Sequence, residues 1–172
     1  WAKDAASRLP REGSARADIG PNRVAQAGGS SVEEIRASKE RSRITNITIA
    51  VASRIAFENF AEGRCDGVIG MGGSTGSLMA TEVMRALPFG IPKLMISSTA
   101  ALPGLSTRYI GTGDIVLFHS VIEISGLSDL LKNVMDRGAH AMAGMVQGGV
   151  TSPKTQKGKA IAITMLGPCE QC

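Results

Sequence analysis

The stretch Gly67–Ala80, GVIGMGGSTGSLMA, combines the residue types that two different chemistries require. Gly72, Ser74 and Gly76 have the G-x-S-x-G spacing of a nucleophile elbow, in which a serine attacks an acyl carbon. The same residues form a glycine-rich turn after an apolar segment, and such turns let backbone N–H groups approach a phosphate. We call residues Gly72–Ser77 the glycine turn and ask which chemistry the rest of the chain supports.

A serine hydrolase needs a histidine to activate Ser74, and the chain has two, His119 and His140. The order Ser74, Asp114, His119 matches the chain order of α/β-hydrolases. However, His140 falls in a helical pattern, and His119 lies in an apolar run that predicts a core position. Serine hydrolysis with Ser74 as the nucleophile is therefore kept as an alternative, together with a strand–helix turn that binds no ligand.

Phosphate binding requires only residues that the stretch itself contains, whereas a hydrolase also needs a histidine from elsewhere in the chain. The dinucleotide fingerprint G-x-G-x-x-G is not met, because after Gly70 and Gly72 the third glycine, Gly76, comes one residue late. A Walker loop is excluded because no lysine follows the glycines. Hydroxyl groups that can bond phosphate oxygens are nevertheless present in the turn on Ser74, Thr75 and Ser77. The glycine turn is therefore predicted to bind phosphate.

The segments around the glycine turn predict a βαβ unit. Gly67–Gly70 has the apolar character of a short buried strand, apolar spacing predicts a helix over Ser77–Leu87, and PKLMISS predicts a second strand. Pro88 is expected to end the helix. Such units build parallel sheets and place the intervening turn at the carboxyl ends of the strands, where open α/β sheets bind ligands.

Other segments extend this α/β pattern on both sides. DIVLFHSVIEI predicts a third strand, and GLSDLLKNVMDRGAHAMAGMVQGG predicts a helix interrupted near Gly138. Upstream, a helical pattern runs from Ser31, which has capping-box spacing with Glu34, to a stop at Gly63.

Two groups of side chains are expected to play structural parts. Lys93, at the entry of the second strand, is predicted to be solvated. Core or interface positions rather than metal binding are predicted for Met135, Met142 and Met145.

Four segments follow from these patterns. Residues 1–30 are predicted to be an irregular arm, 31–150 the α/β domain, 151–158 a polar linker and 159–172 the start of a second α/β domain. The chain begins with Trp1 and stops soon after KAIAITML, a strand pattern with nothing to pair against. We therefore expect it to be a piece of a longer protein.

Composition narrows the class of protein. The 172 residues are 43% hydrophobic, enough for a core, and only 3% aromatic, which disfavours base-stacking surfaces. The net charge of +4 comes from the two ends: residues 1–43 carry nine Lys/Arg against six Asp/Glu, and the middle has no basic excess. A nucleic-acid-binding face is therefore disfavoured.

Cysteine content and hydropathy suggest a location. Three cysteines argue against a disulfide scaffold: Cys65 is predicted to be a buried free thiol, and Cys169 and Cys172 form a C-x-x-C pair with no second pair downstream. No apolar run reaches the ~18 residues of a membrane span. A cytoplasmic protein without membrane contacts is expected.

Two segments together resemble a known family. DGVIGMGGSTGSLMATEVMRALPFGIPKLMISSTA and YIGTGDIVLFHSVIEISGLSDLLKNVMDRGAHAMAGMV are similar to the N-terminal domain of the tomato-mosaic-virus-resistance-protein-like family, which has bacterial, fungal and plant members. The resemblance covers roughly residues 18–166. It rests on the glycine turn, ALPFGIPK and GDI…SV in the same order and spacing.

The resemblance implies a Rossmann-like domain, usually dimeric, that binds ATP with or without Mg²⁺. By residue match, the phosphates would contact Gly72, Gly73, Ser74, Gly76 and Ser77. Ser97, Ser98 and Thr99 would lie beside them, and Asp114 would orient loops or Mg²⁺.

The chain also departs from the family pattern. The family turn reads G-G-S-G-G-T, so Thr75 replaces a glycine and Ser77 a threonine, and Glu123 and Ser128 replace an aspartate and an asparagine. The family's opening strand, with its Thr/Asp/Lys turn, is missing from this chain.

Taken together, the sequence predicts a three-layer, Rossmann-like α/β domain with a parallel sheet, truncated at its first strand. It is predicted to be an ATP-binding, homodimeric module that holds phosphates at the glycine turn. Whether it is an enzyme is left open, and the alternatives are a Ser74 hydrolase or a dimerisation domain without a ligand.

Overall fold

The computed structural model describes residues 21–27, 41–126 and 128–148. Its centre is a sheet of three parallel strands in the order β1 (Val68–Gly72), β2 (Lys93–Ser97) and β3 (Val116–His119). The predicted α/β class with a parallel sheet is confirmed. In the register, Gly72 pairs with Ser97 and Ser97 with His119, so the three strands end side by side.

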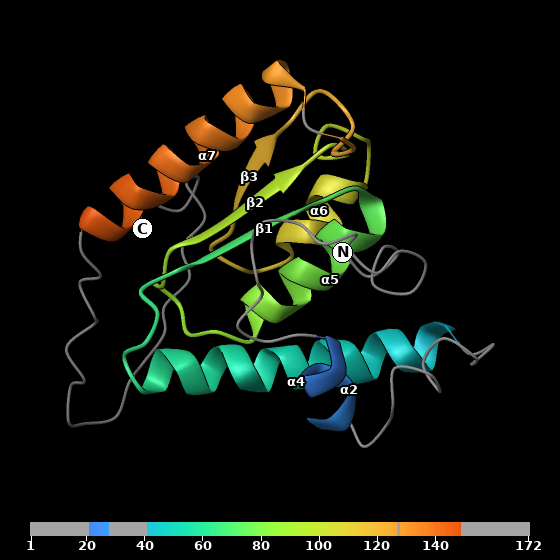
Figure 1. Ribbon diagram of the computed structural model, residues 1–172, viewed down its shortest axis with the longest axis vertical. Coiled ribbons are helices and arrows are strands. Elements are labelled where there is room, and N and C mark those ends of the chain that lie inside the picture. The colour runs from blue at the N-terminus through green and yellow to red at the C-terminus, as the bar shows by residue number, and fades with distance from the viewer. Residues whose placement is uncertain (1–20, 28–40, 127, 149–172) are drawn as a thin grey trace, which may run out of the picture.

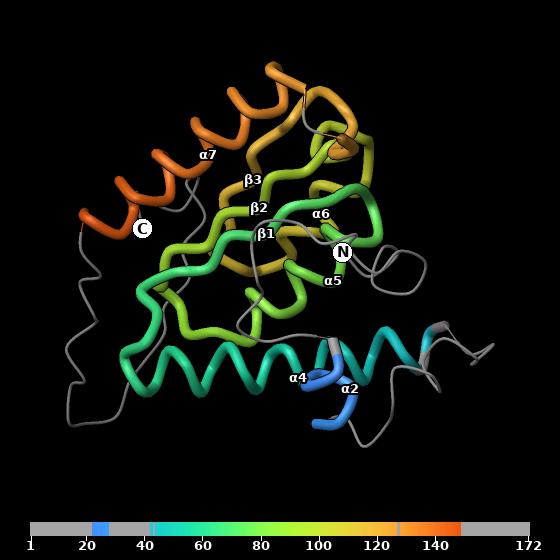
Figure 2. The backbone as a smooth tube through the Cα atoms, viewed as in Figure 1, coloured from blue at the N-terminus to red at the C-terminus, as the bar shows by residue number. Residues whose placement is uncertain are grey.

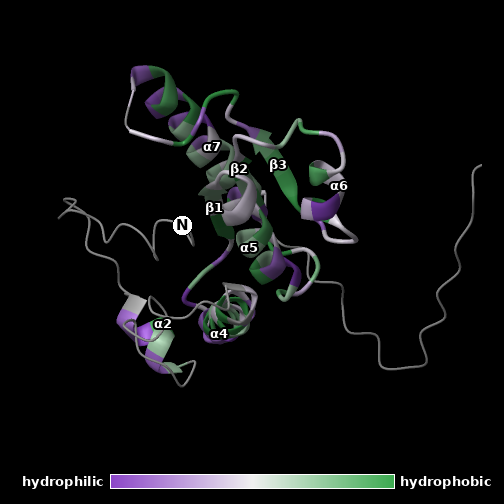
Figure 3. Ribbon diagram, turned by 90° about the vertical axis from the view of Figure 1, so that its right-hand side faces the viewer, coloured by the Kyte–Doolittle hydropathy of each residue, from purple (hydrophilic) through white to green (hydrophobic). Residues whose placement is uncertain are grey.

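Helices cover both faces of the sheet, as Figure 1 shows. Helix α5 (Ser74–Arg85) and the short helix α6 (Leu105–Ile110) lie on one face, and α7 (Asp129–Gln147) lies on the other. Helix α4 (Arg41–Ala61) packs on the outer side of α5, and α2 (Pro21–Ala27) packs against α4. Figure 3, turned by 90°, shows the same succession from α7 through the sheet to α5 and α4.

The central strand β2 carries both halves of the core, because all five of its residues are buried. Met95 packs with Met84 of α5, whereas Leu94 and Ile96 pack with Val134 of α7. Alternate residues of a strand point to opposite faces, so the centre of a strand covered on both sides is apolar at every position, as Leu94–Ile96 is. The predicted core methionines Met135, Met142 and Met145 pack on the α7 side, as expected.

Helix α5 begins three residues earlier than the sequence pattern predicted, at Ser74 instead of Ser77. Strand β1 correspondingly reaches Gly72, so Gly73 alone separates the two elements, and Figure 2 shows this sharp reversal of the chain. Small residues permit it: a Cβ on Gly72 would lie 3.1 Å from the Cα of Gly76. The predicted strand–turn–helix order is confirmed, but most of the glycine turn is the first turn of a helix.

The predicted interruption of the last helix near Gly138 is wrong. Helix α7 is continuous from Asp129 to Gln147, and the hydroxyl of its N-cap Ser128 accepts a bond from the N–H of Leu131. Gly138 is there for close packing, since a Cβ on it would lie only 2.6 Å from Cδ1 of Ile96.

The flanking elements differ from the sequence pattern in length. The third strand was predicted correctly but spans only Val116–His119. Residues 21–27 form α2, although an irregular arm was predicted there. The long helical pattern is confirmed over α4, which ends before Gly63 with its φ of +66°.

Several predictions fall outside the described residues. They are the Ser31–Glu34 capping box, the linker 151–158, the second-domain segment 159–172 and the Cys169–Cys172 pair. Cys65 is described and is half-buried rather than buried. No helix in the described parts of the chain is long and apolar enough to cross a membrane.

Candidate functional site at the carboxyl edge of the sheet

The aligned ends of the three strands bring the glycine turn and the segment after β2 together. The carbonyl of Gly72 accepts the N–H of Ser98 at 3.3 Å, which joins the two segments directly. The hydroxyls of Ser77 and Ser97 lie 2.7 Å apart. The sequence-predicted residues 72–77 and 97–99 therefore form one cluster.

Backbone donors at the start of α5 are open. The first α5 donor with a partner among the described residues is the N–H of Ser77, which bonds the carbonyl of Gly73 at 2.8 Å. The N–H groups of Ser74, Thr75 and Gly76 precede it, and the N-cap Gly73 has no side chain to satisfy them. The side chains of Ser74 and Thr75 are exposed, so solvent reaches this turn.

The strain that a threonine would bear in place of a family glycine is not present. Thr75 lies inside α5, and the only described non-glycine residue with positive φ is Val121, at +67°. The helical start therefore accommodates Thr75 without the left-handed conformation that favours glycine.

The predicted phosphate-contacting set divides into open and buried members. Ser77 and Ser97 are fully buried, and the Ser77 hydroxyl also lies 3.2 Å from the Gly72 carbonyl. Gly76 is buried as well. The hydroxyls of Ser77 and Ser97 thus hold α5 to β2. Solvent reaches Gly73, Ser74, Thr75 and Ser98 of the cluster, and we call the surface that they form at the carboxyl ends of the strands the rim.

Glu123 is a rim residue that the sequence did not place at the site. Its carboxylate oxygen accepts a long hydrogen bond of 3.4 Å from the hydroxyl of Ser98. The segment bends back to the rim at Val121, whose φ of +67° is a strained conformation for a β-branched residue. The only sequence signal was that Glu123 stands where the family has an aspartate, so position 123 keeps its acidic character, but this does not show where the side chain lies.

The structure does not bring Asp114 to the glycine turn. Asp114 precedes β3 at the opposite edge of the sheet, where its carboxylate accepts Lys93 Nζ and the N–H of Gly90, each at 2.6 Å. Lys93 is 1% exposed, so its predicted solvation is wrong. Burial raises the pKa of Asp114, but the hydrogen bonds from Lys93 and Gly90 outweigh it and hold the pKa below 3.8.

A hydrolase triad of Ser74, His119 and Asp114 is not assembled. His119 is exposed, not in the core as its apolar surroundings predicted, and its Nδ1 lies 3.2 Å from the carbonyl of Ser97. Asp114 is five residues earlier, about 16 Å along an extended strand. His140 is on α7, where its Nδ1 contacts the carbonyl of Asp136 in the same helix.

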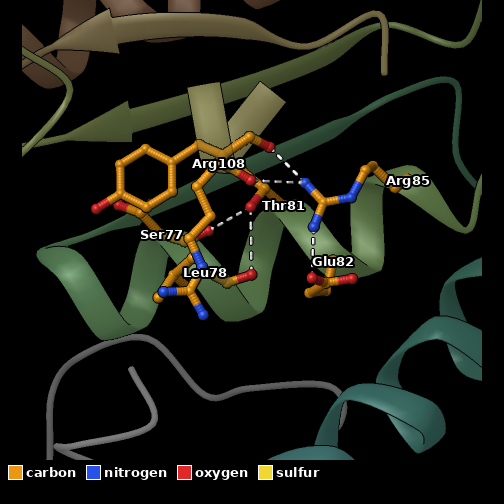
Figure 4. A network of polar contacts seen from close by, with 7 residues as sticks. Ser77, Leu78, Thr81, Glu82, Arg85 and Arg108 are labelled. Carbon is orange, nitrogen blue, oxygen red and sulfur yellow. Dashed lines mark hydrogen bonds and ion pairs between the residues drawn. The ribbon is translucent and has the colours of Figure 1, made fainter. Parts of the chain in front are cut away.

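Behind the rim, Tyr109 and Arg85 form a polar network that sequence reasoning missed. The Tyr109 hydroxyl lies 2.7 Å from Oγ1 of Thr99. Arg85 donates from α5 to the carbonyls of Tyr109 and Arg108 at the end of α6, and it pairs with Glu82 (Figure 4). No local periodicity marks the contacts between elements, because Tyr109 and Thr99 are ten positions apart and Arg85 is more than twenty positions from the carbonyls of Arg108 and Tyr109.

Residues 4–151 match the N-terminal domain of the Uncharacterised protein family (UPF0261). The chain belongs to this family. The resemblance to the tomato-mosaic-virus-resistance-protein-like family is confirmed by its relatives, which include both kinds of protein.

Three relatives illustrate the family. A UPF0261 protein of Clostridium tetani is 35% identical, over 91% of this chain and 38% of its own length. The ToMV resistance protein Tm-1(GCR237) of Solanum lycopersicum is 40% identical, over 75% of this chain and 18% of its own length. A UPF0261 protein of Mesorhizobium japonicum is 37% identical, over 70% of this chain and 30% of its own length. The chain thus spans well under half of each of these relatives.

Proposed function

We propose that this domain binds the phosphates of a nucleotide, ATP, at the first turn of α5. The observation that carries the proposal is the exposed helix start, where the N–H groups of Ser74, Thr75 and Gly76 have no acceptor among the described residues. Unpaired amides and the positive end of a helix dipole favour an anion at this position. No acidic residue lies in the first turn of α5 to oppose it.

The absence of a side chain at Gly73 supports the proposal, because packing does not explain it. A Cβ on Gly70 would lie 2.9 Å from Ala80, and one on Gly72 3.1 Å from Gly76, so the fold itself requires these glycines. A Cβ on Gly73 would meet only the Ser98 hydroxyl at 3.6 Å, an ordinary contact, and the φ of Gly73 is −79°. Glycine at position 73 instead leaves room for a ligand to approach the amides.

Glu123 bears on whether Mg²⁺ accompanies the nucleotide. A carboxylate beside Ser98 disfavours a free polyphosphate through like charge, whereas Mg²⁺ bound to phosphate takes carboxylate and hydroxyl oxygens as ligands. Among the described residues, no three His, Cys, Asp or Glu side chains gather to hold a metal. The residues present suit an ion carried mainly by phosphates and water, and we propose MgATP as the ligand.

The proposal is tested by calorimetric titration of the chain with MgATP, ATP in EDTA, and inorganic tripolyphosphate. We expect Gly73→Val to weaken the binding of MgATP by about tenfold or more, which corresponds to the loss of one charge-assisted hydrogen bond. Gly144→Ala is the matched control, because a Cβ there meets nothing within 4 Å and α7 covers the other face of the sheet. If wild type binds no phosphate compound, the proposal is wrong.

Ser74→Ala separates nucleotide binding from the hydrolase alternative. The substitution should reduce the binding free energy of MgATP by about 1 kcal/mol, as expected for the loss of one hydrogen bond, and binding should remain detectable. If instead the wild-type chain cleaves an activated ester and Ser74→Ala abolishes that activity, Ser74 is a nucleophile and the hydrolase interpretation replaces ours.

We also propose that the domain self-associates through the exposed part of β1 on the sheet face that α7 covers. This strand is at the edge of the described sheet, and it exposes 41% of Ile69 and 45% of Met71. Sedimentation of wild type and of Ile69→Lys tests this, and a monomer at all concentrations contradicts it.

A further inference from the structure

We propose that Tyr109 is a positioning residue for the phosphate site, holding Ser98 against the glycine turn through Thr99. The inference rests on the proposed function and names the residue that gives its rim a fixed shape. Tyr109 is on α6, and nothing in the sequence connects it with the turn.

Ser98 lies between two residues whose hydroxyls are hydrogen-bonded, the buried Ser97 and the half-buried Thr99. On one side, Oγ of Ser97 lies 2.7 Å from the Ser77 hydroxyl of α5. On the other, Oγ1 of Thr99 lies 3.2 Å from Ser97 Oγ and 2.7 Å from the Tyr109 hydroxyl. The N–H of Thr99 also donates to Ser97 Oγ at 3.2 Å. A chain of hydroxyls therefore runs from the first turn of α5, past Ser98, to α6.

The phenol at the end of this chain is firmly placed. Tyr109 is 0% exposed, and a buried tyrosine hydroxyl normally finds a hydrogen-bond partner, which here is Thr99. Arg85 fixes the backbone of the same residue by donating to its carbonyl at 2.5 Å, and Glu82 orients Arg85 (Figure 4). Tyr109 is thus tied to α5 by its backbone and to the rim segment by its side chain.

The consequence concerns Ser98, whose hydroxyl lies nearest to solvent in the cluster 97–99 and makes only a long, exposed bond of 3.4 Å to Glu123. Its N–H is tied to the Gly72 carbonyl at 3.3 Å, and the backbone on either side of that bond is held by the hydroxyl contacts of Ser97 and Thr99. Without the Tyr109 hydroxyl, Thr99 loses its outer partner and the segment after β2 gains freedom. Ligand binding must then order that segment, which weakens affinity without removing any group that touches phosphate.

The experiment is a double-mutant cycle of Tyr109→Phe and Ser98→Ala, read by titration with MgATP and with tripolyphosphate. We expect Tyr109→Phe to weaken binding roughly threefold to tenfold, the range of one hydrogen bond. In the Ser98→Ala background the same change should have little further effect, since coupled residues are not additive. Thr107→Ala, which removes an exposed hydroxyl from the same helix, should leave affinity unchanged.

Hydrogen exchange of the Thr99 amide distinguishes failure of this inference from failure of the proposed function. Tyr109→Phe should speed its exchange severalfold, with or without a ligand. If Tyr109→Phe speeds exchange of the Thr99 amide but the wild-type chain binds no phosphate compound, the nucleotide site is refuted, whereas the positioning of Ser98 by Tyr109 is supported. Additive affinity losses in the cycle, or unchanged exchange at Thr99, overturn the inference even if wild type binds MgATP.

Discussion

Replacing Asp114 by Asn tests whether this residue is structural or belongs to a ligand site. The substitution preserves the shape of the side chain but removes the charge that faces Lys93 Nζ at 2.6 Å. Lys93 is 1% exposed, and its only other described acceptor is the carbonyl of Pro88 at 2.8 Å. The ammonium group would be left buried without a counter-charge.

The expected cost follows from this geometry. Breaking a buried ion pair by removing one partner costs about 3–5 kcal/mol. The side chain of Asp114 is 24% exposed, so water offsets part of that loss, and we expect the lower end of the range. Since domains have roughly 5–15 kcal/mol of stability, the variant should be markedly less stable. Adding Lys93→Met removes the unpaired charge and should restore much of the loss.

Urea unfolding followed by far-ultraviolet circular dichroism at neutral pH measures the effect. The control is Asp129→Asn, because Asp129 and Lys132 form an exposed pair at 2.9 Å and should contribute less than about 0.5 kcal/mol. Affinity for MgATP should be unchanged in folded Asp114→Asn, since the pair is at the far edge of the sheet. The reasoning would be refuted if Asp114→Asn lowered the free energy of unfolding by less than about 1 kcal/mol, or if the folded variant no longer bound MgATP.

Three further predictions concern pH, packing and strain. Because the pKa of Asp114 in the folded state lies below its unfolded value of 3.8, the stabilisation that this carboxylate provides is fully present at neutral pH, begins to fall near pH 4 and is lost as the pH passes through the lower folded-state pKa. The stabilities of wild type and Asp114→Asn should therefore approach one another as the pH is lowered below about 4, as acid unfolding curves will show. Gly138→Ala should destabilise by about 1–3 kcal/mol, because its Cβ would lie 2.6 Å from Ile96 Cδ1, whereas Gly144→Ala should not, as thermal melts will show. Val121→Gly should stabilise by about 1 kcal/mol by relieving the positive φ of an exposed residue, and an unchanged or lower melting temperature would contradict this.

Local patterns were sufficient to predict the elements that form the sheet. PKLMISS became β2, and its centre, Leu94–Ile96, is apolar at every position because this part of the strand is covered on both faces. The glycines between a strand and a helix predicted the sharp reversal at Gly73. The same patterns predicted element ends less well: Ser74–Ser77 are small and polar, as in a loop, but they form the first turn of α5.

Side-chain roles depended on contacts that local patterns do not carry. Lys93 looked like a solvated strand entry, but Asp114, twenty-one residues later, lies opposite it and makes burial possible. Ser77 and Ser97 looked like phosphate ligands, yet they bond one another across twenty residues. Chemical type alone does not show whether a hydroxyl faces solvent or the interior.

The sequence by itself determined the α/β class, the parallel direction of the strands and the position of the glycine turn, since these follow from hydrophobic spacing and from backbone constraints within a few residues. The tertiary structure alone decided which groups of that turn are open: it buried Ser77 and Ser97, placed Glu123 beside Ser98 and moved Asp114 to the opposite edge. The physical reason is that exposure and partnership are set by residues distant in the chain, which only the packed fold brings together.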